Sequence, residues 1–135
     1  MKDQPKLSSF TSKIQAIQKL NWRDVTITSV TDDSRNVKKG TIFVAIPGEK
    51  LDGHDYIPEA VEKNASAIVC QDIPSPLPDC PVIQVNNSRR ALSTLAYQIH
   101  GPKNINSIGV TGTDGKTTTT ELIRSIIQES GETAG

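Results

Sequence analysis

The sequence predicts an α/β protein made of one complete domain and the opening part of a second. Short apolar runs alternate with segments in which apolar residues recur every three or four positions, a pattern typical of strands alternating with helices. A glycine stop followed by proline, Gly101-Pro102, interrupts this pattern, and a new strand, a glycine-rich turn and a helix follow. We therefore expect one domain over residues 1–102 and the truncated start of another over 103–135.

The first elements of the predicted domain are a helix, a strand and a polar turn. Phe10, Ile14, Ile17 and Leu20 are spaced by three and four residues, which predicts one surface helix with a serine cap before it. The segment 25–30 alternates β-branched and polar residues, as a strand does. Residues 32–36 are rich in side chains that bond their own backbone, so we expect a turn there.

Three further strands are expected because their residues are apolar on both faces, as in strands buried inside an α/β sheet. The helices between them have start and stop signals: proline in a first turn, asparagine in a left-handed closing position, and asparagine or serine as a cap. These elements are strands over 42–46, 67–70 and 82–85, a short helix from Tyr56 to Asn64, and a helix from Asn87 or Ser88 to His100.

The composition argues against several classes of protein. Lys+Arg and Asp+Glu number 15 each, so the chain lacks the overall positive field that holds nucleic acid. No apolar run is long enough to span a bilayer or to resemble a signal peptide, so we expect a cytoplasmic protein without membrane insertion. The two cysteines have no zinc-site spacing, and Cys70 is expected to be a small buried apolar residue. The oligomeric state is not predicted.

A glycine-rich turn between the strand expected over 105–110 and the helix that Gly131 closes carries the strongest chemical signal. Polyphosphate binding requires converging backbone N–H groups, which glycine permits, and it is favoured at a helix N-terminus. Lys116 would place a charge on the outer phosphates, and the Thr117 hydroxyl would bind Mg²⁺. The gap between Gly112 and Gly115 is shorter than in the common form of this loop. The predicted phosphate-binding residues are Gly112, Thr113, Asp114, Gly115, Lys116, Thr117 and Thr118.

Three motifs in order resemble the Mur ligase family. They are TDDSRNVKKGTIFVAIPGEKLDGHDY over 31–56, SRRALSTLA over 88–96, and GVTGTDGKTTTT over 109–120. The spacing between the DSR and DGH motifs is part of the resemblance. The family loop usually has asparagine at the position of Asp114. Three motifs in the family's order are far more specific than any one of them.

The resemblance implies a first domain that binds the uridine diphosphate part of a substrate and a central domain that binds ATP and Mg²⁺. By position, Asp32 and Ser34 would contact the uridine diphosphate, and Glu49, Lys50 and Leu51 would form a second contact loop. The implied reaction adds the third amino acid, L-lysine or meso-diaminopimelate, to UDP-N-acetylmuramoyl-L-alanyl-D-glutamate in peptidoglycan synthesis. ATP would convert the substrate carboxylate into an acyl phosphate, with Lys116 as a catalytic residue.

Two other functions remain open from the sequence. A folylpolyglutamate or cyanophycin synthetase has a similar ATP loop but lacks the domain that carries the DSR and DGH motifs. The other is a stand-alone module that binds UDP-sugars, complete as encoded and acting in regulation or scaffolding, which predicts affinity for a UDP-sugar together with a stably folded C-terminus. Because the metal-binding carboxylate and the amino-acid site of the family would follow residue 135, we expect this chain to be inactive alone.

Overall fold

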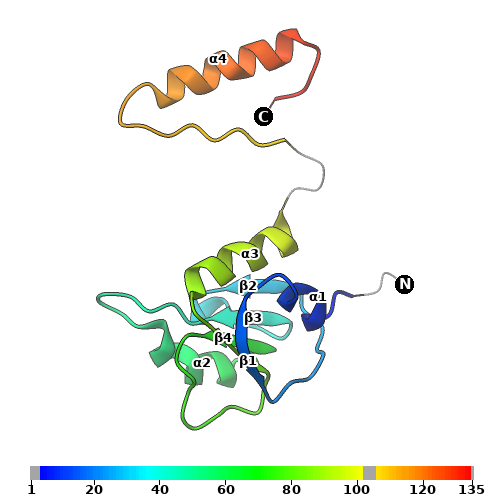
Figure 1. The fold of residues 1–135 in the computed structure, drawn as a ribbon, viewed down its shortest axis with the longest axis vertical. Helices are drawn as coiled ribbons and strands as arrows, with labels where there is room; N and C mark the ends of the chain where they lie inside the picture. Colours follow the sequence, from blue (N-terminus) through cyan, green and yellow to red (C-terminus); the bar gives the residue numbers. More distant parts are fainter. Residues whose placement is uncertain (1–3, 102–105, 135) are drawn as a thin grey trace. The chain divides into compact units, whose positions relative to one another are not determined.

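The structure is a computed structural model of the 135-residue chain and describes residues 4–101 and 106–134 (Figure 1). The chain divides into two compact units, Met1–Pro102 and Lys103–Gly135. The first contains a sheet with helices, and the second contains one long helix, α4 (Lys116–Glu129). The fold is α/β, as the sequence predicts.

A five-stranded sheet in the order β1-β5-β4-β3-β2 forms the centre of the first unit. Strands β2 to β5 are parallel, whereas β1 pairs with β5 in the antiparallel direction. The parallel strands therefore end at one common edge, called here the carboxyl edge. The elements are α1 (Leu7–Thr11), β1 (Ala16–Leu20), β2 (Ser29–Thr31), η1 (Ser34–Asn36), β3 (Thr41–Val44), η2 (Gly53–Tyr56), α2 (Ile57–Glu62), β4 (Ala67–Cys70), β5 (Val82–Val85) and α3 (Ser88–His100).

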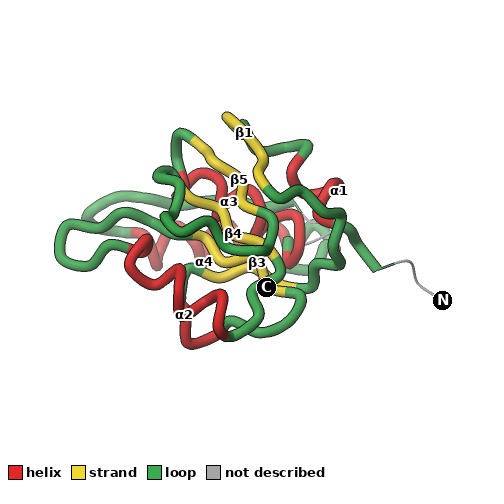
Figure 2. The backbone as a smooth tube through the Cα atoms, turned by 90° about the horizontal axis from the view of Figure 1, so that it is seen from below, coloured by secondary structure: helices red, strands yellow, loops and turns green. Residues whose placement is uncertain are grey.

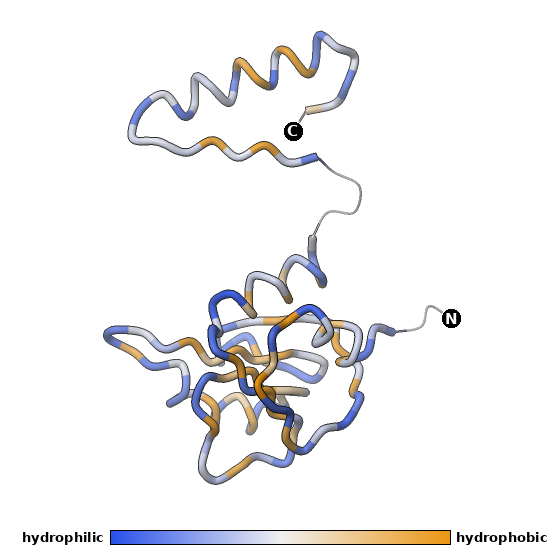
Figure 3. The backbone as a smooth tube through the Cα atoms, in the orientation of Figure 1, coloured by the Kyte–Doolittle hydropathy of each residue, from blue (hydrophilic) through white to orange (hydrophobic). Residues whose placement is uncertain are grey.

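Helices cover both faces of the sheet (Figure 2). Successive residues of a strand point to opposite faces, so β3 contributes to two cores. Ile42 and Val44 pack in one cluster with residues of α1 and α3, and Phe43 packs in the other with residues of α2. In Figure 3, which colours the backbone by hydropathy, apolar segments gather in the interior of the first unit and polar segments lie in its loops. All four residues of β3 and of β4 are buried.

Several local predictions are confirmed. The strands over 67–70 and 82–85 have the expected bounds, and the predicted 42–46 strand is β3 with a shift at its ends. Asn64 closes α2 with a left-handed φ of 63°. The Asn87 side chain caps α3 by accepting from the Arg90 N–H. Cys70 is fully buried, and burial raises the pKa of its thiol to about 11, which keeps the thiol protonated and unreactive near neutral pH.

The helix predicted through Phe10, Ile14, Ile17 and Leu20 is wrong beyond its first turn. Helix α1 ends at Thr11, and residues 16–20 form β1 at the edge of the sheet. Ile17 is 54% exposed, so it does not belong to the buried stripe that the spacing predicted. Pairing with β5 supplies backbone hydrogen bonds that a short helix with an interrupted apolar face cannot match.

Two other strands differ from expectation. The predicted strand over 25–30 is reduced to β2 at Ser29–Thr31, and Thr26 forms only an isolated bridge with Lys6. Residues 106–110 of the second unit are not in a strand, and Ile105 lies outside the described residues. A strand requires a partner, and the described part of this unit offers only α4. Within the described residues, no helix combines the length and apolar character needed to cross a membrane.

Candidate functional site

The two segments predicted to bind the uridine diphosphate leave the sheet at the carboxyl edge. Strands β2 and β3 are parallel neighbours, with Thr31 opposite Phe43. Asp32 and Ser34 follow β2 directly, and the segment with Glu49 to Leu51 follows β3. Ligands of open α/β sheets bind outside the carboxyl ends of the strands, so this edge is the expected place for a ligand.

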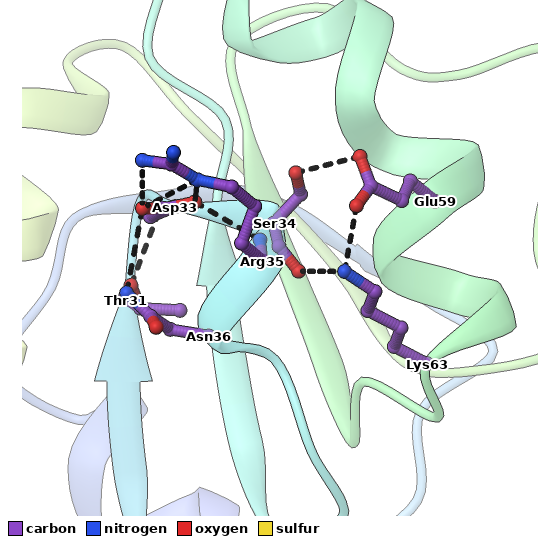
Figure 4. Close-up of polar contacts among 7 residues, drawn as sticks. All are labelled: Thr31, Asp33, Ser34, Arg35, Asn36, Glu59 and Lys63. Carbon is purple, nitrogen blue, oxygen red and sulfur yellow. Dashed lines mark hydrogen bonds and ion pairs between the residues drawn. The ribbon is translucent and has the colours of Figure 1, made fainter.

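The turn after β2 is held by an ion pair between neighbours (Figure 4). Asp33 caps η1 by accepting from the Arg35 N–H at 2.9 Å, and its carboxylate also receives Arg35 Nε at 2.9 Å and Nη2 at 2.7 Å. These bonds, led by the side-chain contact with Arg35, lower the pKa of Asp33 to about 2. Asp32 beside it is exposed. The turn therefore presents Asp32 outward while Asp33 is occupied internally.

Replacing Arg35 with glutamine is expected to raise the pKa of Asp33 from about 2 toward the ordinary value of 3.8. A lowered carboxyl pKa stabilises the fold above the ordinary value, and this contribution is lost as the pH falls through the folded value. NMR titration of the Asp33 carboxyl carbon measures the change. Lys63→Gln is the matched control, because Lys63 is the smallest of the causes that lower this pKa. If the Arg35→Gln variant leaves the Asp33 pKa unchanged, Arg35 is not the cause of the lowered value.

Ser34 is fixed by α2 rather than by its own turn. Its side chain is buried, and its Oγ donates to Glu59 at 2.8 Å (Figure 4). Lys63 donates to Glu59 at 2.7 Å and to the Ser34 carbonyl oxygen at 3.3 Å. The hydrogen bonds from Lys63 and then Ser34 lower the pKa of Glu59. The Ser34 hydroxyl hydrogen is thus committed, and its oxygen remains an acceptor for a donor group of a ligand.

Sequence reasoning missed Glu59 and Lys63. Their spacing of four residues on a helix predicts a surface ion pair, which the structure contains. Nothing in the local sequence indicates that this pair reaches across to Ser34, twenty-five residues before Glu59. This contact needs the crossover that brings α2 beside η1.

The segment with Glu49, Lys50 and Leu51 lies on an exposed loop. Leu51 is 70% exposed. The loop is closed at its base by a hydrogen bond from the Gly53 N–H to the Ile46 carbonyl at 2.9 Å. A Cβ at Gly53 would lie 2.5 Å from the Ile46 nitrogen, so glycine is required for this close approach. The three side chains are therefore presented outward from a closed base.

Within the DGH motif at the base of this loop, the histidine and the aspartate contact each other. His54 Nδ1 lies 2.6 Å from Asp52 Oδ1. Across residues 4–101 and 106–134, no cluster of three or more His, Cys, Asp and Glu side chains is placed to hold a metal ion.

The glycine-rich loop of the second unit has the backbone expected of a phosphate-binding turn. Gly112 and Gly115 have φ values of 149° and 73°, which favour glycine. Gly115 is the N-cap of α4, and no side chain caps this end. The Lys116 ammonium folds back onto the carbonyl oxygens of Gly112 and Thr113. The uncapped amides, the helix N-terminus and the lysine together fit a polyphosphate.

The remaining predicted residues of this loop are all exposed: Thr113, Asp114, Thr117 and Thr118. Thr117 lies in the first turn of α4, where a hydroxyl can meet a metal ion bound to phosphate. The sheet-edge residues and this loop belong to different units.

A hollow of about 910 Å³ lies at the amino ends of the strands rather than at the carboxyl edge. Lys38 and Lys39 before β3 and Ser66 before β4 contribute to its lining. None of the predicted substrate residues lines it. Lys63, which donates to the Ser34 carbonyl, does line it.

The sequence of the chain was compared with family models and with known proteins, and both comparisons match the same family. Residues 26–100 match the model described as "Mur ligase family, catalytic domain". The UDP-N-acetylmuramoyl-L-alanyl-D-glutamate–2,6-diaminopimelate ligase of Cytophaga hutchinsonii is 36% identical over 127 residues, covering 91% of this chain and 26% of that protein. The enzyme of the same name from Aquifex aeolicus is 44% identical over 111 residues, covering 81% and 23%. The chain thus spans about a quarter of the length of these relatives.

Solved structures similar to this chain include ligases of the same family. A crystal structure of MurF from Acinetobacter baumannii superposes with a TM-score of 0.71 at 25% identity, covering 90% of this chain and 27% of that one. The MurF ligase of Thermotoga maritima in complex with ADP gives a TM-score of 0.58 at 33% identity, covering 75% and 23%.

Proposed function

Because the chain belongs to the Mur ligase family, we propose that it supplies the substrate-binding domain and the ATP loop of a peptidoglycan-synthesis ligase. The proposed reaction joins diaminopimelate to UDP-N-acetylmuramoyl-L-alanyl-D-glutamate with hydrolysis of ATP. The names of relatives at 36% and 44% identity support this substrate pair. The similarity to the Cytophaga hutchinsonii enzyme covers 91% of the chain and so includes the first unit as well as the loop. This coverage favours the proposed function over a folylpolyglutamate or cyanophycin synthetase.

The observation that carries the proposal is the common edge shared by the turn after β2 and the loop after β3. Asp32, Ser34 and the Glu49 to Leu51 segment surround this edge and offer both acceptors and a cation. We assign to them the uridine diphosphate. Lys50 would contribute charge to the diphosphate, and the Ser34 oxygen would accept from the base or sugar.

The second unit would hold ATP through Gly112 to Thr118, with the Thr117 hydroxyl as a ligand to Mg²⁺. The ADP in the complex of the Thermotoga maritima MurF supports a nucleotide cofactor. Mg²⁺ would neutralise phosphate charge during transfer to the substrate carboxylate. Lys116, which contacts the Gly112 and Thr113 carbonyls in this structure, would turn its ammonium to the transferred phosphate.

Isothermal titration calorimetry with UDP-N-acetylmuramoyl-L-alanyl-D-glutamate tests the proposal. The chain is expected to bind this compound, and Lys50→Ala is expected to lower the affinity roughly tenfold, as loss of one charged hydrogen bond does. Lys39→Ala is the matched control, since Lys39 lines the hollow at the opposite edge of the sheet. Absence of binding, or equal weakening by both variants, would refute the assignment of the carboxyl edge.

A further inference from the structure

The His54 side chain joins the loop after β3 to the end of β4. Its Nε2 accepts two backbone hydrogen bonds, from the Gln71 N–H at 3.1 Å and the Asp72 N–H at 3.2 Å. Its Nδ1 lies 2.6 Å from Asp52 Oδ1. The side chain is 13% exposed. Each ring nitrogen of this histidine thus has a specific partner.

The partners fix the protonation state of the ring. Two N–H donors can share Nε2 only if that nitrogen carries a lone pair, so the single proton of a neutral imidazole must be on Nδ1. That N–H donates to the Asp52 carboxylate, which also accepts from the His54 backbone N–H at 2.9 Å. An added proton on Nε2 would face two donors and remove both acceptor contacts.

These contacts belong to a closed chain of hydrogen bonds around the loop. The Gln71 side-chain oxygen accepts from the Ser88 N–H at 3.0 Å, at the start of α3. Arg89, which follows Ser88 in α3, donates from Nη2 to the Pro47 carbonyl at 3.2 Å. Pro47 is the first residue of the loop. The loop over 47–52 is therefore tied at both ends, through His54 at one and Arg89 at the other.

Three of the elements joined by these hydrogen bonds carry charged residues. Asp52 and Asp55 flank it in the chain, Asp72 follows β4, and Arg89 extends from α3. A proton added to Nε2 would remove the two amide contacts and leave the Asp52 contact in place.

We propose that His54 is a positioning residue that holds the substrate loop over 47–52 against the end of β4 only while its imidazole is neutral. This inference rests on the proposed function, because the loop carries Glu49, Lys50 and Leu51. Acidification would release the loop base and weaken binding of the uridine diphosphate. The effect acts through loop position, since His54 itself is not assigned a contact with the substrate.

The hydrogen bonds from the Gln71 and Asp72 amides to His54 are called here the His54 latch. NMR of the unmodified chain tests this latch without any ligand. Imidazole ¹⁵N spectra at neutral pH are expected to show a protonated Nδ1 and an unprotonated Nε2 for His54. Hydrogen exchange at the Gln71 and Asp72 amides, corrected for intrinsic pH dependence, is expected to speed up as His54 titrates. The opposite tautomer, or amide protection that does not change with His54 protonation, would overturn the proposal. His100, on the last turn of α3, serves as the internal reference.

Two variants separate the ring nitrogens. His54→Gln places an amide oxygen near the position of Nε2, so it is expected to keep the Gln71 and Asp72 amides protected at every pH. His54→Asn places its amide near Nδ1, retaining a partner for Asp52 and losing the Nε2 acceptor. Binding of UDP-N-acetylmuramoyl-L-alanyl-D-glutamate is then measured for the wild-type chain and both variants across the titration of His54.

Wild-type affinity is expected to fall roughly tenfold on acidification, the cost of one or two lost hydrogen bonds. His54→Gln is expected to bind with little pH dependence, and His54→Asn to bind weakly throughout. Equal pH dependence in wild type and His54→Gln would overturn the positioning role. If no form binds at any pH, the proposed function fails and the substrate role of the loop fails with it, while the NMR result still decides the latch.

Discussion

Replacing Phe43 with alanine is expected to lower the free energy of unfolding of the first unit by about 3–5 kcal/mol. Phe43 is fully buried in β3, and it packs in the cluster between the sheet and α2. Truncation removes apolar contacts on that side and leaves a cavity that the surrounding strands, paired on both sides, cannot collapse to fill. Domains of this size have a total stability of roughly 5–15 kcal/mol, so the variant should be near its unfolding threshold.

Urea denaturation followed by far-UV circular dichroism measures this loss. Leu77→Ala is a suitable control, because Leu77 is 42% exposed in the proline-rich loop before β5. Its expected effect is within about 0.5 kcal/mol. A Phe43→Ala midpoint that matches the Leu77→Ala midpoint would show that this face of the sheet is not tightly packed.

Gly53→Ala is expected to destabilise the first unit by about 1–3 kcal/mol and to reduce affinity for the uridine diphosphate more than tenfold. An alanine Cβ would lie 2.5 Å from the Ile46 nitrogen and 2.7 Å from its oxygen, and both atoms are backbone. The loop base must therefore open, which breaks the Gly53 to Ile46 hydrogen bond and moves His54 away from β4.

The matched control is Gly109→Ala, since a Cβ at Gly109 meets no atom within 4 Å. Its unfolding curve and its UDP-substrate affinity should be close to those of the wild-type chain. Both quantities are obtained from the same samples by urea titration and calorimetry. Wild-type affinity in a Gly53→Ala chain that is measurably destabilised would separate the loop base from substrate binding.

The buried parallel strands could be predicted from the sequence because their signal is local. Four successive apolar residues between turn signals, as in β4, leave few alternatives. Strand β1 could not be predicted this way. Its residues have a helix-like spacing, and only the unpaired edge of β5, more than sixty residues later, decides that they form a strand. The expected strand over 105–110 fails for the converse reason, because no described residue of its unit pairs with it.

In the candidate site, too, some residues could be predicted from local sequence and others depend on distant contacts. Family motifs located Asp32, Ser34 and the Glu49 to Leu51 loop, and the parallel pairing of β2 with β3 explains why these segments share an edge. The residues that fix them could not be found locally. The Ser34 hydroxyl donates a hydrogen bond to Glu59, which lies 25 residues later in the sequence. The Gln71 N–H donates to His54, which lies 17 residues earlier. Such contacts depend on crossovers that bring distant segments together.

The antiparallel strand at the border of the sheet affects how the molecule behaves among its neighbours. An uncovered border strand can recruit extended segments from other molecules and start aggregation. β1 is irregular between Ala16 and Gln18, and the charged Lys19 lies 4.3 Å above the Trp22 ring. A kink and a positive charge both discourage docking of a foreign strand. The residues whose spacing predicts a helix are thus expected to limit aggregation at high protein concentration.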